Sequence, residues 1–203
     1  MIWRGLDEWQ VEAAAVELAA DGLVATGTQI GSDPVAYRLD YRLDARGDFI
    51  TRALEITVTG QGWSRRLDLR HDGGGAWTCE AGAEGDVDLP PPGCDPALLA
   101  GALDCDLGRS PLTNLMPIRR TGLDRRTGAE DFLMAWVSVP DLSVVASAQR
   151  YEHLGLSGDG SLVRYVDRGE FDGFTADLLL DADGFVIHYP ELAECVGDEP
   201  REP

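Results

Sequence analysis

The sequence predicts a mainly β protein in which one large, curved antiparallel sheet, open or partly closed, carries at most one or two short helices. Successive segments alternate apolar and polar residues with a period of two, which is the pattern of half-buried strands. Turn-forming residues separate these segments. The 203 residues contain no repeat of about 40 residues, which argues against a propeller. We therefore expect a single β-rich domain over residues 1–196.

Residues 8–20 are the ambiguous element. This run is rich in Ala, Glu and Leu, so its local propensity favours a helix. Apolar and polar positions also alternate from Val11 to Val16, as they would in a strand. Taken alone, these residues favour the helix.

Clear strands follow in the first half of the chain. From Val35 to Leu43 apolar residues alternate with charged ones, and the turn Asp44–Asp48 leads into a second strand, so the two form a hairpin. Another turn, Asp72–Gly75, joins a second pair. The strands expected in this half cover residues 35–43, 49–58, 65–71 and 76–80.

The middle of the chain interrupts the alternation. Residues 82–96 hold glycines, acids and three consecutive prolines, which exclude regular structure. Residues 96–103 allow one helical turn, and the chain is expected to be irregular up to Pro117. Alternation then resumes, and residues 197–203 form an acidic tail that we expect to be disordered. The later strands are expected at residues 131–139, 142–151, 162–166, 174–180 and 185–189.

Composition and motifs exclude several classes of function. The 17 basic residues, all arginine, face 36 acidic ones, and the net charge of −19 opposes binding to nucleic acid or to an anionic membrane. The absence of lysine excludes a Schiff-base or P-loop lysine. The cysteine and histidine spacings match no zinc or redox motif, so we expect no metal and no cofactor.

The sequence also carries expectations about location. The first residues lack a basic region followed by an apolar one, which is the pattern of a signal peptide. No apolar run approaches the roughly 18 residues of a membrane span. We therefore expect a cytoplasmic protein without stable membrane insertion.

One polar stretch in the middle of the chain is unusual. If Asp104 and Asp106 lie on a strand, they share a face at roughly 7 Å and repel unless a cation or an arginine separates them. Arg119 and Arg120 follow closely, and Asn114 is the only asparagine. Four interpretations stay open: a metal site, an acid/base site, an arginine rim for an anionic head group, and a buried structural ion-pair cluster.

The same stretch carries a family resemblance. From Asp104 to Arg120 the chain reads DCDLGRSPLTNLMPIRR, which is similar to the motif DxDLGxTPxTNTLPIRRL of bacterial proteins described as "putative glycolipid-binding". Gly75-Ala76-Trp77, Gln149-Arg150-Tyr151 and Tyr189-Pro190 also fit, and the resemblance extends from Trp3 to Pro190. Ser110 replaces a threonine, and Leu115-Met116 replaces Thr-Leu.

The resemblance implies a fold like that of the bacterial lipoprotein-carrier (localisation factor) proteins. That fold is a curved antiparallel sheet forming an unclosed barrel around an apolar cavity, with a short helical or loop lid. Residues 96–117 would be the lid, and residues 11–19 and 23–30 would form a strand pair. We adopt this strand pair over the helix, because tertiary context overrides local propensity.

The first functional hypothesis is a non-enzymatic binder or carrier of an amphipathic, lipid-like molecule of the glycolipid type. Apolar sheet residues would hold its tail, and Arg119 or Arg120, with Asn114 and Gln149, would hold its polar end. An enzyme using Asp104 and Asp106 as acid/base groups or metal ligands is one alternative. A protein-interaction module using the mouth of the barrel is another. The expected ligand-binding residues are Asp104, Asp106, Thr113, Asn114, Arg119, Arg120, Gln149 and Tyr151.

Overall fold

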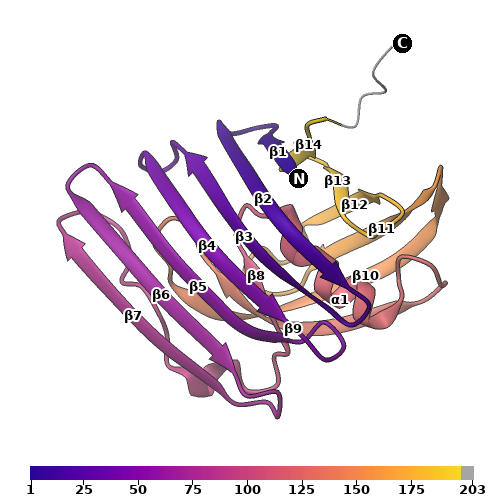
Figure 1. The fold of residues 1–203 in the computed structure, drawn as a ribbon, viewed down its shortest axis with the longest axis horizontal. Helices are drawn as coiled ribbons and strands as arrows, with labels where there is room; N and C mark the ends of the chain where they lie inside the picture. Colours follow the sequence, from indigo (N-terminus) through magenta and orange to yellow (C-terminus); the bar gives the residue numbers. More distant parts are fainter. Residues whose placement is uncertain (198–203) are drawn as a thin grey trace.

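The computed structural model describes residues 1–197, which form one large curved sheet (Figure 1). Its fourteen strands run in the order β7-β6-β5-β4-β3-β2-β1-β14-β13-β12-β11-β10-β9-β8. The two ends of this order do not pair, so the sheet is not closed into a barrel. The predicted mainly β, single-sheet fold is confirmed. All neighbouring strands are antiparallel except β8 and β9, which are parallel.

The strands in chain order are β1 (Ile2–Gly5), β2 (Gln10–Ala19), β3 (Gly22–Gly31), β4 (Tyr37–Ala45), β5 (Thr51–Gly60), β6 (Trp63–His71), β7 (Trp77–Gly85), β8 (Asp104–Leu107), β9 (Ala129–Val137), β10 (Val144–Ser157), β11 (Gly160–Asp167), β12 (Thr175–Leu180), β13 (Val186–Tyr189) and β14 (Ala193–Cys195). The helical segments are η1 (Pro96–Leu99), η2 (Pro111–Asn114) and α1 (Leu115–Thr121). Among the described residues no helix is long and apolar enough to cross a membrane. Apart from Gly197, the tail predicted to be disordered lies outside the described residues.

The ambiguous N-terminal segment is a strand. β2 pairs with β1 on one side and along its whole length with β3 on the other. These two ladders occupy its backbone groups, and its alternate residues Glu12 and Ala14 are buried against the core. The helix favoured by local propensity is therefore wrong, and the strand pair implied by the family resemblance is confirmed.

The structure corrects the prediction at two further places. β7 continues to Gly85 although a break was expected from residue 82, because β7 is an edge strand whose glycines and acids face solvent. The stretch expected to be irregular up to Pro117 contains β8, η2 and α1. Pro111 and Pro117 fit there because each lies in a first helical turn, where the backbone N–H has no partner inside the helix.

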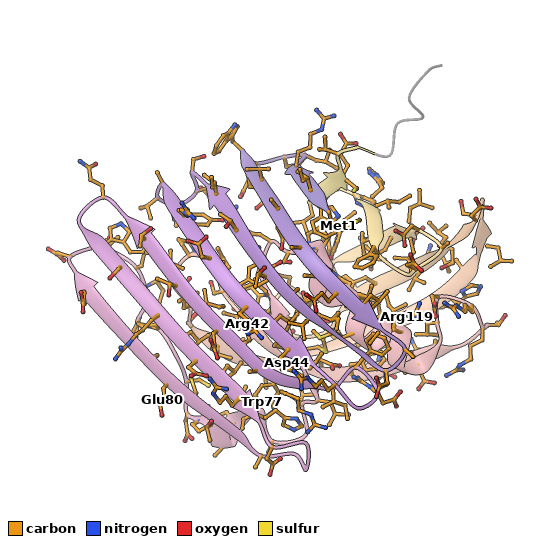
Figure 2. All side chains as sticks on the ribbon, in the orientation of Figure 1. Met1, Arg42, Asp44, Trp77, Glu80 and Arg119 are labelled. Atoms are coloured by element: carbon orange, nitrogen blue, oxygen red, sulfur yellow. The ribbon has the colours of Figure 1, made fainter. Side chains whose placement is uncertain are left out.

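The concave face of the sheet is filled by the chain itself. The inward residues of β4 to β6 pack in one cluster with apolar side chains of the segment from Pro96 to Thr121. Trp77 Nε1 donates to the carbonyl oxygen of Ala102 at 2.9 Å and fixes this segment to β7. The segment predicted as a lid therefore lies inside the curve of the sheet. The outer face carries charged rows that include Arg42, Asp44 and Glu80 (Figure 2).

Two tyrosines of β4 lie over glycines of β3 on the inner face. Tyr41 is the cross-strand partner of Gly27, and a Cβ atom at Gly27 would come within 2.4 Å of the Tyr41 ring. Tyr37 covers Gly31 in the same way. Because glycine has no side chain, Gly27 and Gly31 leave room for the two tyrosine rings over β3. The Tyr41 hydroxyl thereby reaches β2, where it donates to Glu12 Oε1 at 2.7 Å.

We expect Gly27→Ala to lower the free energy of unfolding by about 1–3 kcal/mol, because the new methyl group displaces a buried, hydrogen-bonded ring. Urea denaturation measures this loss. Thr26→Ala is the matched control, since Thr26 is exposed on the same strand, and we expect it to change stability by less than about 1 kcal/mol. Equal losses in the two variants would contradict the packing of Tyr41 on Gly27.

Candidate functional site

A cavity of about 510 Å³ opens at one side of the sheet. Its walls come from the β1–β2 turn, the residues around the end of β8, and strands β9, β11 and β13 with their loops. Five of the lining residues are aromatic, five are acidic, and one is an arginine, Arg109. The aromatic residues are Trp136, Tyr165, Phe171, Phe174 and Tyr189, and the acidic ones are Asp7, Glu8, Asp106, Asp167 and Glu191.

Asp106 lies at the inner wall of this cavity. Its Oδ1 accepts a hydrogen bond from the Thr113 hydroxyl at 2.9 Å, and its Oδ2 accepts one from Gln149 Nε2 at 2.6 Å. Burial raises the pKa of the Asp106 carboxyl above its ordinary value, against the lowering effect of these two donors. Asp106 is thus a half-buried carboxyl group held by neutral donors.

The network continues from Asp106 to the other predicted residues. The Tyr151 hydroxyl lies 2.9 Å from Asn114 Oδ1 and 3.2 Å from Gln149 Oε1. Asn114 also lines the cavity. Five of the eight predicted site residues are therefore joined by hydrogen bonds, and two of the five face the cavity directly.

The other three predicted residues lie elsewhere. Arg120 grips Asp104 with two hydrogen bonds of 2.6 and 2.5 Å, and the guanidinium stacks over the ring of Phe132 at 5.6 Å. Arg119 donates to the carbonyl oxygen of Asp183 at 2.9 Å. None of the three lines the cavity. The arginine expected between the two aspartates thus pairs with Asp104 only.

The partners of Asp104 and Asp106 are relevant to the interpretation of this stretch as a metal site. The carboxylates of Asp104 and Asp106 are held by different partners, an arginine for the first and Thr113 with Gln149 for the second. Within residues 1–197, no group of three or more His, Cys, Asp or Glu side chains could hold a metal ion.

Asp167 was missed by the sequence reasoning. It ends β11, and its Oδ1 accepts the backbone N–H groups of Gly169 and Phe171 at 2.7 and 3.1 Å, while the Tyr165 hydroxyl donates to its Oδ2 at 2.9 Å. Asp167 therefore shapes the loop that places Phe171 at the cavity. The Asp-x-Gly sequence after a strand was the available signal, because aspartate hydrogen-bonds the backbone two residues on.

Glu12 was also missed, because its segment was ambiguous between helix and strand. Glu12 is 2% exposed, and its Oε1 accepts hydrogen bonds from Tyr41 and from the Ser110 hydroxyl, both at 2.7 Å. Burial raises its pKa to about 7. Because Ser110 lines the cavity, Glu12 lies directly behind the cavity wall.

Arg109 closes the wall beside Ser110. It forms ion pairs with Glu8 and, at 3.0 Å, with Asp33, so it ties the end of β8 to the β1–β2 turn and to the turn after β3. The cation of the cavity lining is therefore already paired with two carboxylates of the protein.

Fold and cavity together define a class: single-sheet, open β proteins that fill their own concave face and keep a small side cavity of mixed polarity. Comparison with protein families assigns the chain to one family. The profile of the family described as "Putative glycolipid-binding" matches residues 1–195, and the chain belongs to this family.

A solved structure supports the assignment. The chain is similar to a DUF1089 family protein from Pseudomonas aeruginosa, with 29% sequence identity and a TM-score of 0.71, over 96% of this chain and 95% of that one. No functionally curated protein matches the chain. The family resemblance drawn from the Asp104–Arg120 motif is thus confirmed, whereas likeness to the lipoprotein carriers stays a prediction.

Proposed function

We propose that this protein is a non-enzymatic binder of an amphipathic ligand of the glycolipid type, and that the polar head of the ligand occupies the side cavity. The observation that carries the proposal is the combination of five aromatic side chains with buried hydrogen-bonding groups in one cavity of about 510 Å³. Cavities of this size and composition are typical of small-molecule sites.

The lining suits a sugar-like head. Sugar rings present C–H groups that pack on aromatic rings, and their hydroxyl groups donate to carboxylates. Each oxygen of Asp106 has a single protein donor, and so does Oδ2 of Asp167, so acceptor capacity remains at the cavity. An anionic head would meet five carboxylates and one arginine that is already paired, which is unfavourable.

Apolar side chains at the mouth of the cavity suit the tail. Phe171 lines the cavity and is 55% exposed, and Trp9, which is 67% exposed, belongs to the same β1–β2 turn as the lining residues Asp7 and Glu8. Leu6 of this turn is also exposed. The inner face of the sheet is occupied by the segment from Pro96 to Thr121, so the tail would lie along these rim residues.

Calorimetric titration with octyl glucoside tests the proposal. We expect Phe171→Ala to weaken binding about 3- to 10-fold, because it removes ring area from both cavity and rim. Leu156→Ala is the matched control: Leu156 is equally apolar and 78% exposed, and it lies on the β10–β11 hairpin outside the cavity. Its affinity should equal that of the unchanged protein.

Arg119→Ala separates this proposal from a head-group site on α1. Arg119 lies outside the cavity lining, so the variant should bind normally. Loss of binding in Arg119→Ala together with normal binding in Phe171→Ala would overturn the cavity as the site.

A further inference from the structure

We infer that the polar head bound in the cavity carries a positive charge, so that the cavity selects an amine-bearing head over a neutral one. The inference rests on the proposed function and narrows its ligand class. It starts from the charges of the lining, where five carboxylates face one arginine. Arg109 is already shared between Glu8 and Asp33, so it does not neutralise the other lining acids.

The two aspartates of β8 differ in whether a cation pairs with them. Asp104 is fully buried and has the guanidinium of Arg120 on both oxygens. Asp106, two residues later, has only a hydroxyl and an amide as donors. Carboxylates that are largely shielded from water in proteins are generally paired with a cation, and the half-buried Asp106 has none among the described residues. A ligand cation would supply that partner.

The acidic groups around Asp106 also favour a positively charged ligand group. The charges of Asp167 and Asp104 both act to raise the pKa of Asp106, in addition to its burial. Behind the wall, the Oε2 atom of Glu12 is buried and has no hydrogen-bond partner among the described residues. A positive group in the cavity would offset the repulsion that Asp167 and Asp104 exert on Asp106.

The aromatic residues are an independent observation. They form two contact groups, Trp136 with Phe171 at 5.6 Å between ring centroids, and Tyr165 with Phe174 and Tyr189 at 6.2 and 6.1 Å. An ammonium group is attracted to aromatic rings, most strongly where water is excluded. Rings and carboxylates in one cavity are a combination that recognises ammonium groups.

Three ligands with the same octyl chain and the same type of sugar ring test the inference: octyl glucoside, octyl glucosaminide and octyl N-acetylglucosaminide. The second carries an amine, and the third has the same nitrogen without the charge. We expect the glucosaminide to bind at least about 10-fold more tightly than either neutral ligand.

Asp106→Asn should bring the affinity for the glucosaminide down to that of the neutral ligands. Asp167→Asn is the second variant, should the first fail to fold, and it should reduce the same preference. Asp159→Asn, in the exposed β10–β11 turn, is the control and should leave the preference unchanged. Equal or weaker binding of the glucosaminide would overturn the inference while leaving the proposed function intact. Failure of all three ligands to bind would overturn the proposed function as well.

Discussion

Arg120→Met is expected to destabilise the protein by about 3–5 kcal/mol, because it leaves the carboxylate of Asp104 buried without its partner. Asp104 is completely buried, and both of its oxygens accept from the Arg120 guanidinium. Burial already raises the pKa of Asp104 despite this arginine, so removal of the arginine should drive the group to take up a proton. Urea unfolding at neutral pH measures the loss.

The matched control is Arg164→Met. Arg164 grips Asp177 with two hydrogen bonds of 2.7 and 3.1 Å, so its geometry resembles that of the Arg120 pair. Its side chain is 41% exposed, however, and such pairs contribute less than about 1 kcal/mol. A similar loss in the two arginine variants would contradict the buried pair. The double variant Asp104→Asn/Arg120→Met should lose less than the sum of the single changes, since the two residues are coupled.

Glu12→Gln should remove a pH dependence of stability worth roughly 3 kcal/mol. Burial raises the pKa of Glu12 from 4.5 to about 7. Between these two values the folded protein keeps a proton that the unfolded chain has released, so Glu12 lowers the free energy of unfolding as the pH rises through this window. Above pH 7 the effect is constant.

The measurement is the difference in stability between Glu12→Gln and the unchanged protein at several pH values. The free energy of unfolding of Glu12→Gln minus that of the unchanged protein should increase from pH 4.5 to about 7. Titrations of other groups occur in both proteins and cancel in this difference. Glu17→Gln is the control, because Glu17 lies exposed on the same strand β2. A difference that stays flat with pH for Glu12→Gln would show that Glu12 titrates normally.

Much of the fold could be predicted because most strands are local hairpins. β4 to β6 alternate cleanly between apolar and polar residues, and the turns between them carry glycine or aspartate. The strand β2 could not be predicted from its own residues, since alanine and glutamate favour a helix and only pairing with β1 and β3 reverses that preference. The short strands β1 and β14 come from opposite ends of the chain and pair with each other, so their own residues carry little signal.

The candidate site was harder to predict for a physical reason. Asp106 and Asn114 lie in the motif that the family shares, and Gln149 lies in a second stretch that fits the family. The structure joins Gln149 directly to Asp106 and, through Tyr151, to Asn114. The partners of the other polar groups depend on where these groups are buried, and burial is set by the tertiary structure rather than by the local sequence. Asp104 and Asp106 look equivalent along the chain, yet only one of them receives an arginine. Glu12 and Asp167 become site residues only once distant strands meet.

The pairing of β1 with β14 joins the two halves of the sheet at a seam of three residue pairs. Strands β2 to β7 form one meander and β9 to β13 another, so each half consists mainly of local contacts. The cavity takes residues from both sides of the seam, among them Gln10 on one side and Tyr189 on the other. A molecule in the cavity therefore binds only when the halves are joined, and its binding free energy adds to the cohesion of the seam. Ligand occupancy and the local opening of the β1–β14 junction are thus linked equilibria, and the amide protons of this junction should exchange more slowly in the loaded protein than in the free one.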